Sequence, residues 1–387
     1  MGGLSVFFHI VEREFGKFFS NSVAMAIFIG APLLYGVVFG SLYADGQVYD
    51  IPVAVVDGSR GVIGERIVDG LREHENVSVA GVFACEQGLW DSFVRGDVQA
   101  IITLGPDFDK DVLLGRMPEV HVRLNMANML VTNYVSGAVQ HVLAAQEAKI
   151  RTGAVIRQGS VPAPVAQDHH GAFSVHYSRY FNPSGNYLFF LLPGFLGMVL
   201  QQVFLLVAAL SFAREEEEKT FDELTGKTRS AAMIVFGKAV PYGIMGMLMW
   251  LFSLHGILYW YGVPIDGSPA ALYGLSLLFV LSMTSIGILV SAAVPSQLKA
   301  TEILMVMAAP AFLLSGYTWP LSQMPQAVAA VAKLIPTTHF LEAFRKIILA
   351  DASMVHLLQE SVFLALLAVI PFNLTIFIVK RKIRRQN

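Results

Sequence analysis

Apolar residues along this chain gather in six long runs that are separated by more polar segments. A helix of about 20 residues crosses the roughly 30 Å hydrocarbon core of a bilayer, so the runs predict six transmembrane helices. Glu302 and Pro310 interrupt the fifth run, and the pattern leaves open whether that run crosses the membrane, breaks or re-enters. The six runs cover residues 23–43, 186–212, 232–261, 270–293, 300–317 and 360–379.

Residues 4–20, before the first run, place seven apolar side chains near helical spacing with four charged residues between them. This pattern predicts that segment 1–22 is an amphipathic helix lying on the inner membrane surface. The alternative is that it extends the first transmembrane helix into the cytosol. Run 23–43 is longer than the apolar part of a signal peptide, about 7–15 residues, and lacks a cleavage site. We therefore interpret it as a retained membrane anchor.

Residues 44–185 lack such long runs and instead alternate short apolar stretches with helical patterns. Strands that alternate with helices are typical of an α/β domain. The Pro- and Gly-rich stretch 157–174 predicts a linker back to the membrane. The fold class predicted is thus an α-helical polytopic membrane protein with six transmembrane helices, an N-terminal interfacial helix and an inserted α/β extracytoplasmic domain. The expected strands are 51–57, 77–83, 100–104 and 119–125, and the expected helices are 64–74, 88–99 and 128–150.

Composition supports a membrane protein, because 55% of the residues are hydrophobic and only 14% are charged, whereas soluble proteins carry about 25% charged residues. The net charge of −2 gives no basic surface for nucleic acid. Lysine and arginine concentrate in the tail 380–387 and the loop 213–231, and none lies in the turn 262–270. The positive-inside rule then places both termini in the cytoplasm and the domain 44–185 outside.

Candidate sites for enzyme chemistry are weak in this sequence. The stretch "AREEEEKTFDELTGKT" (213–228) ends in Gly-Lys-Thr, but Phe221 stands where a phosphate-binding loop requires its first glycine. The glycines after residue 57 do not fit a dinucleotide-binding pattern either. Ser282, Thr284 and Ser285 are typical of residues that support helix packing in a membrane. We therefore predict that the chain has no catalytic residue and binds no cofactor itself.

Metal-binding and disulfide chemistry are also not predicted. Four possible ligands lie close together in the linker, but no helical or strand spacing arranges them, which favours solvated loop residues. The single cysteine, Cys85, cannot form an internal disulfide and is predicted to be a small buried hydrophobic residue. The four possible ligands are Asp168, His169, His170 and His176.

Two groups of polar residues are functional candidates. In the loop 213–231, charged residues surround Phe221 and Leu224, which predicts a short amphipathic helix. It is either a solvated cap between two spans or a docking helix, with Phe221 and Leu224 as anchors in a soluble partner and its charges at the rim. Within the spans, polar groups often mark a pathway or bond to another helix. Both interpretations apply to Gln201 and Gln202 in the second run, and Glu302 near the inner end of the fifth is a further pathway or interface candidate.

Four stretches together resemble the permease subunit of type-2 ABC exporters, in the branch with a large periplasmic domain between the first two spans. Two positions depart from the family pattern: Lys219 stands where glycine is frequent, and Thr228-Arg229 where Thr-Pro or Ser-Pro is frequent. Gly237-Lys238 matches the pair at the family's inner membrane edge. The stretches are "RYFNPSGNYLFFLLPGFLGMVLQQ", "AREEEEKTFDELTGKTRSAAMIVFGKAVPY", "SGYTWPLSQMP" and "IPTTHFLEAFRKIIL".

This resemblance implies a dimer with a second permease copy or paralogue in the bacterial inner membrane. It also implies cytoplasmic ABC ATPase subunits that bind ATP and Mg, and a periplasmic membrane-fusion adaptor. The substrate implied is a drug, a lipid or a similar amphiphile. The alternatives are a non-transporting scaffold or receptor of the same layout, and a membrane enzyme. The ATPase-coupling helix would comprise Glu216, Glu217, Lys219, Thr220, Phe221, Glu223 and Leu224.

Overall fold

The chain divides into two compact units in the computed structural model. One unit comprises Met1–Gly46 with Arg179–Asn387, and the other comprises Gln47–Ser178. The second unit is therefore inserted between the first and second predicted spans, as the sequence indicates. The structure describes residues 3–114, 116, 118–125, 129–157, 182, 185–265, 267–350, 352 and 354–385. Most of the predicted linker, with its four possible metal ligands, lies outside these residues.

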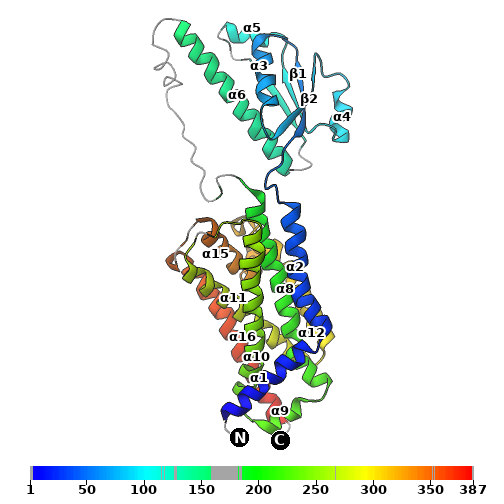
Figure 1. The fold of residues 1–387 in the computed structure, drawn as a ribbon, viewed down its shortest axis with the longest axis vertical. Coiled ribbons are helices and arrows are strands. Elements are labelled where there is room, and N and C mark those ends of the chain that lie inside the picture. The colour runs from blue at the N-terminus through cyan, green and yellow to red at the C-terminus, as the bar shows by residue number, and fades with distance from the viewer. Residues whose placement is uncertain are drawn as a thin grey trace. The chain divides into compact units, whose positions relative to one another are not determined.

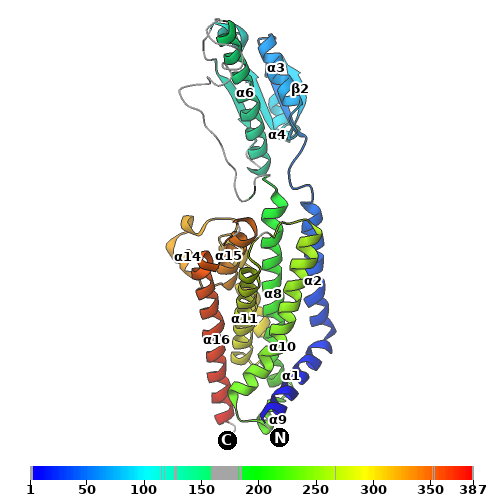
Figure 2. The same cartoon turned by 60° about the vertical axis from the view of Figure 1, so that its left-hand side comes forward.

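Six helices of the first unit are long and apolar enough to cross a membrane, which confirms the six predicted spans. They form a bundle with both chain termini at the same end (Figures 1 and 2). The third span ends in a π-helical turn, η1 (Ser253–Leu258). The helices are α2 (Ser22–Leu42), α8 (Tyr187–Glu217), α10 (Ala231–Phe252), α11 (Pro269–Ala293), α12 (Gln297–Ala308) with α13 (Ala311–Leu314), and α16 (Leu358–Arg385).

Helices α8 and α11 form the centre of this bundle, since 72% and 67% of their apolar segments are buried, against 28% in α2 and α16. Small residues let these two backbones approach closely. A Cβ atom added to Gly287 of α11 would lie 2.5 Å from the Cβ of Ala208 in α8. Ser291 of α11 donates to the Ala209 carbonyl at 2.5 Å and accepts from two backbone N–H groups of α8. Hydroxyl groups therefore support helix packing here.

The fifth run is broken, because α12 ends at Ala308 and α13 begins only at Ala311. Pro310 lies between them and lacks the N–H group that would continue the hydrogen bonds of α12. Short helices follow before the last span. They are η2 (Leu321–Gln323), α14 (Gln326–Ala332), α15 (Pro336–Ala350) and η3 (Met354–Leu357).

The N-terminal segment forms its own helix, α1 (Gly3–Phe19), which crosses the end of the bundle that carries both termini (Figure 1). Asn21 caps the start of α2 by accepting from the Ala24 N–H at 3.0 Å. The alternative of one continuous first helix is therefore wrong. Helix α1 buries Ile10 and Phe18 and leaves Leu4 exposed, and its place on a membrane surface stays a prediction.

The second unit is an α/β domain, as predicted. Its sheet has the order β2-β1-β3-β4, with β1 parallel to β2 and β3, and β4 antiparallel to β3. One face packs against α3 and α6, whose apolar residues join those of β1 and β3 in one core, and the other face is covered by α4. Helix α5 was not expected. The elements are β1 (Ile51–Asp57), α3 (Val62–Arg72), β2 (Val77–Phe83), α4 (Leu89–Arg95), β3 (Ala100–Leu104), α5 (Phe108–Leu113), β4 (Val120–Leu124) and α6 (Met129–Arg157).

Cys85 is exposed, so the prediction that it is buried is wrong. It follows the end of β2, which is an edge strand of the sheet. A cysteine in a bend beside an edge strand has no second layer to cover it, and its apolar character does not change that position.

Candidate functional site: a buried charge network beside the loop between α8 and α10

The loop between the second and third spans contains the predicted short helix, α9 (Phe221–Lys227). Helix α8 extends beyond its apolar run to Glu217, so the glutamates occupy its last helical turn. Lys219 then reverses the chain with a φ of +56°. Glycine adopts this left-handed region without steric cost, whereas other residues occupy it rarely. The backbone therefore explains why a glycine fits the family pattern at this position.

Phe221 and Leu224 do not face the solvent. They are 5% and 1% exposed and belong to the apolar core of the bundle unit. Their predicted role as anchors in another protein is therefore wrong, because α9 turns its apolar face towards its own chain. The face of α9 that is exposed carries Asp222, Glu223 and Lys227.

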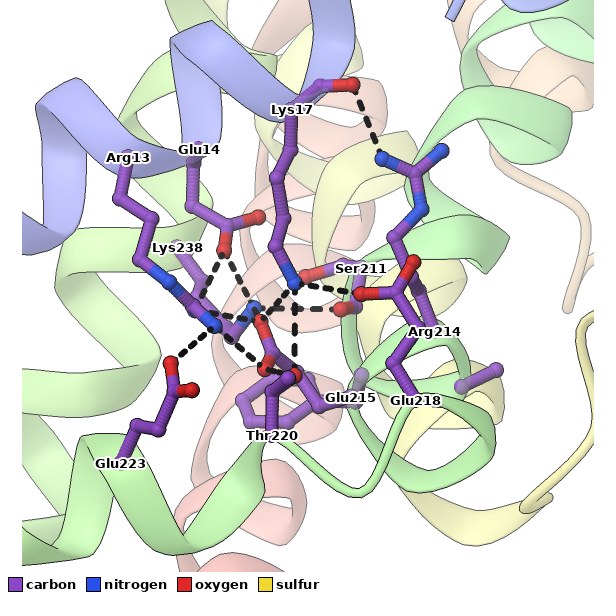
Figure 3. A network of polar contacts seen from close by, with 12 residues as sticks. Arg13, Glu14, Lys17, Ser211, Arg214, Glu215, Glu218, Thr220, Glu223 and Lys238 are labelled. Carbon is purple, nitrogen blue, oxygen red and sulfur yellow. Dashed lines mark hydrogen bonds and ion pairs between the residues drawn. The ribbon is translucent and has the colours of Figure 1, made fainter.

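Glu215, in the last turn of α8, is the centre of a polar network and is fully buried (Figure 3). Its carboxylate accepts from Arg13 at 2.6 and 3.0 Å and from Lys17 at 3.2 Å, both on α1. It also accepts from Lys238 of α10 at 2.9 Å and from the hydroxyl of Thr220. One carboxylate therefore ties α8 to α1, to α10 and to the segment before α9.

Lys238 is the second centre and is also fully buried. Its ammonium group donates to the carboxylates of Glu14 and Glu215 and to the Ser211 carbonyl, the last at 3.1 Å. These three acceptors match the three donors of an ammonium group. Tyr242, one helical turn further along α10, donates to the other oxygen of Glu14 at 3.3 Å. Glu14 and Lys238 thus connect α1 to α10 inside the protein.

Two partly exposed cations, Arg13 and Lys17, connect the buried residues of the network to carboxylates at its exposed edge. Arg13 and Lys17 are 16% and 20% exposed, and they reach outward to Glu223 at 3.4 Å and Glu218 at 3.0 Å. Burial alone would lower the pKa of the Arg13 guanidinium, but the hydrogen bond and the negative charge of Glu215 outweigh it and raise that pKa. The network therefore favours the charged form of Arg13.

The remaining predicted residues of the loop extend the network to other helices. Glu216 pairs with Lys382 of α16 at 2.6 Å. Glu217 accepts from the backbone and side-chain nitrogens of Gln297, at the start of α12. The loop is therefore bound to α1, α10, α12 and α16, that is, to the elements that meet at this end of the bundle.

The site residues predicted from the sequence omitted six members of the network: Arg13, Glu14, Lys17, Glu215, Lys238 and Tyr242. Two signals were present. Glu14 falls on the same helical stripe as the apolar residues Ile10 and Phe18, and Lys238 interrupts an apolar run. A charge inside an apolar pattern needs a buried partner of opposite sign.

The three membrane candidates are not brought together. Gln201 is buried in α8, and neither of its side-chain amide atoms has a hydrogen-bond partner within the described residues. Gln202 is half-buried, and Glu302 is exposed on α12. No interhelical hydrogen bond of Gln201 is present in the described part of the chain, and a pathway role for these residues stays a prediction.

Six spans, an inserted α/β domain and a charged helical loop at the end with both termini define a polytopic helical membrane protein. The sequence model of the family described as "ABC-2 family transporter protein" matches residues 23–377. The chain therefore belongs to this family.

The chain is also similar to proteins that are named as permeases. The chain is 30% identical over 208 residues to "Probable multidrug ABC transporter permease YbhS" of Escherichia coli, which covers 53% of this chain and 55% of YbhS. It is 25% identical to "Inner membrane transport permease YhhJ" of Escherichia coli over 78% of this chain and 77% of YhhJ. It is 23% identical to "Linearmycin resistance permease protein LnrN" of Bacillus subtilis over 93% of this chain and 95% of LnrN. The match to YbhS thus spans about half the length of that relative.

Proposed function

We propose that this chain is the membrane-spanning permease subunit of an ABC exporter, with ATP and Mg bound by a separate ATPase subunit. The observation that carries the proposal is the ionic network of Glu215 and Lys238, which ties the end of α8, beside the α8–α9 loop, to α1 and α10. A partner that pushes on α9 would displace these helices together, because the connection is buried.

The free-energy cost of breaking these ion pairs supports a rigid connection. Breaking a buried, hydrogen-bonded ion pair by removing one partner costs about 3–5 kcal/mol, whereas an exposed pair contributes about 0–1 kcal/mol. Lys238 and Glu215 are both fully buried. The exposed pairs of the rim, such as that of Arg13 with Glu223, can therefore exchange during docking while the buried contacts persist.

Orientation follows from charge. Five basic residues end α16 at the end of the bundle that also carries α1 and α9 (Figures 1 and 2). The positive-inside rule assigns this end to the cytoplasm, where an ATPase subunit would meet the exposed face of α9. The inserted α/β domain would then lie outside, where it would contact a membrane-fusion adaptor.

The substrate proposed is a hydrophobic or amphipathic molecule such as a drug or a lipid, moved outward by a dimer of two permeases. Two matched relatives are named for multidrug transport and for linearmycin resistance. The spans of this chain are strongly apolar, which suits a path for such molecules.

Gly226 offers a test, because it is exposed on α9 and a Cβ atom there would meet no atom within 4 Å. A Gly226→Trp variant therefore projects a large side chain outward without disturbing the fold. We expect the ATPase, identified by mass spectrometry after purification of the tagged full chain from its native membrane, to disappear from this variant.

The matched control is Gly137→Trp on α6 of the α/β domain, where a Cβ atom also meets nothing within 4 Å. This variant should retain the ATPase. Recovery of the same ATPase with Gly226→Trp, or of no ATPase with the unchanged chain, would contradict the proposal.

A further inference from the structure

A charged cleft of about 440 Å³ lies between the α8–α9 loop and the last turns of α16. The end of α8 and the loop contribute the buried Glu215, the half-buried Glu216, Lys219 and Asp222, and α16 contributes Lys382 and Arg385. The cleft adjoins the exposed face of α9, since Asp222 belongs to both.

Some charged side chains of the cleft have partners of opposite charge, and others do not. Lys382 is neutralised by Glu216 at 2.6 Å, and Glu215 already accepts from two cations of α1 and from Lys238. Lys219 and Arg385 are exposed, and within the described residues neither has an ion pair or a hydrogen bond from its side chain. Two positive side chains without a partner in the described residues thus line the cleft, together with the carboxylate of Asp222.

The backbone of Lys219 has a sterically unfavourable conformation. Its φ of +56° lies in the region that glycine adopts freely and other residues rarely adopt. Glycine would make the turn equally well, so the lysine side chain contributes something other than the turn. Its exposed ammonium group at the mouth of the cleft is the contribution that the structure shows.

The basic residues of α16 have two different surroundings. Arg381 lies 4.4 Å from the ring centroid of Phe377, which is exposed on an apolar face of the helix. That position suits a lipid headgroup at the bilayer edge. Arg385 instead lines the cleft together with residues of the α8–α9 loop. A protein segment can match both signs of charge.

We propose that this cleft receives an acidic segment of the ATPase subunit, whose carboxylates pair with Lys219 and Arg385. This inference rests on the proposed function. It adds a second contact beside α9 and makes the end of α16 part of the docking surface. An ATPase seated there would hold the last span and the α8–α9 loop at the same time, next to the existing pair of Glu216 with Lys382.

Site-specific photocrosslinking tests the contact in the full chain within its native membrane. We expect p-benzoylphenylalanine at position 385 and at position 227, which is exposed on α9, to form adducts with the ATPase. The matched control is position 384, which is also exposed on α16 but does not line the cleft, and its ATPase adduct should be at least about tenfold weaker.

The outcomes separate the two claims. ATPase adducts at 227 but not at 385, or lipid adducts at 385, would overturn the inference and leave the proposed function standing. Absence of an ATPase adduct at both 227 and 385 would overturn the proposed function as well.

Charge variants give a second readout. Lys219→Gly removes the ammonium group and relieves the backbone, so a residue that served only the turn would leave ATPase recovery unchanged or improved. We expect Lys219→Gly with Arg385→Glu to lower that recovery by on the order of tenfold, and Lys380→Glu with Arg384→Glu to leave it unchanged. An equal loss of ATPase recovery in both double variants would show that only the total charge of this surface matters, and it would refute the proposed contact in the cleft.

Discussion

Replacing Lys238 by methionine removes a buried charge while keeping a side chain of similar length. The ammonium group contacts Glu14, Glu215 and the Ser211 carbonyl. Glu215 would retain its contacts to Arg13, Lys17 and Thr220, so it would lose only a moderate part of its stabilisation. Glu14 would retain only weaker contacts, to Arg13 at 3.9 Å and to the Tyr242 hydroxyl at 3.3 Å, and it is 1% exposed.

The cost of Lys238→Met should therefore come mainly from Glu14, left buried without its close cation. Loss of one partner of a buried pair costs about 3–5 kcal/mol. Glu14→Gln alone leaves Lys238 with Glu215 and Ser211, and should cost about 1–3 kcal/mol. The double variant no longer buries the Glu14 charge, so its cost should fall below the sum of the two single costs by about 1–3 kcal/mol.

The assay is reversible unfolding of the purified chain in mixed detergent micelles, followed by the fluorescence of its tryptophans. Lys380→Met is the matched control, because Lys380 is exposed on α16 and should change the free energy of unfolding by less than about 0.5 kcal/mol. A cost of Lys238→Met below about 1 kcal/mol, or strictly additive costs in the double variant, would refute the reasoning.

Three further changes test other parts of the molecule. Gly287→Val places a Cβ atom 2.5 Å from the Cβ of Ala208, so α8 and α11 must separate, and the folded fraction seen by size-exclusion chromatography should fall sharply; Gly243→Val, where a Cβ meets nothing within 4 Å, should not lower it. Asp109→Ala removes the carboxylate that accepts from the Ile63 and Gly64 N–H groups at 2.7 and 3.0 Å at the start of α3, and amide hydrogen exchange in α3 should speed up by a factor that corresponds to about 1–2 kcal/mol; unchanged exchange would contradict the cap. Cys85 is exposed, so a maleimide that does not cross membranes should label it in cells whose outer membrane alone is permeabilised; labelling only after the inner membrane is opened would reverse the proposed orientation.

Periodic patterns were sufficient to predict the spans and most elements of the inserted domain, but not the short helix α5. Apolar runs located six spans, strand and helix patterns located the inserted domain, and Pro310 indicated the interruption of the fifth run. These features depend on neighbours in sequence, because burial on one face of a helix or strand repeats every few residues.

The site was only partly predictable. The pattern of Phe221 and Leu224 correctly indicated an apolar face on α9, but it does not tell which protein covers that face, and here the chain's own bundle does. The pair of Lys238 with Glu14 joins residues 224 positions apart. No local pattern specifies such a partner, although each charge stood out within an apolar setting.

Coupling between α9 and the bundle is the central claim, and the ratio of transported substrate to hydrolysed ATP tests it most directly. The measurement uses proteoliposomes that contain the chain with its ATPase. Our account predicts that Lys238→Met still binds the ATPase, because the exposed face of α9 is unchanged, but that it transports less substrate per ATP than the unchanged chain. A normal ratio for Lys238→Met at normal ATPase binding would contradict it.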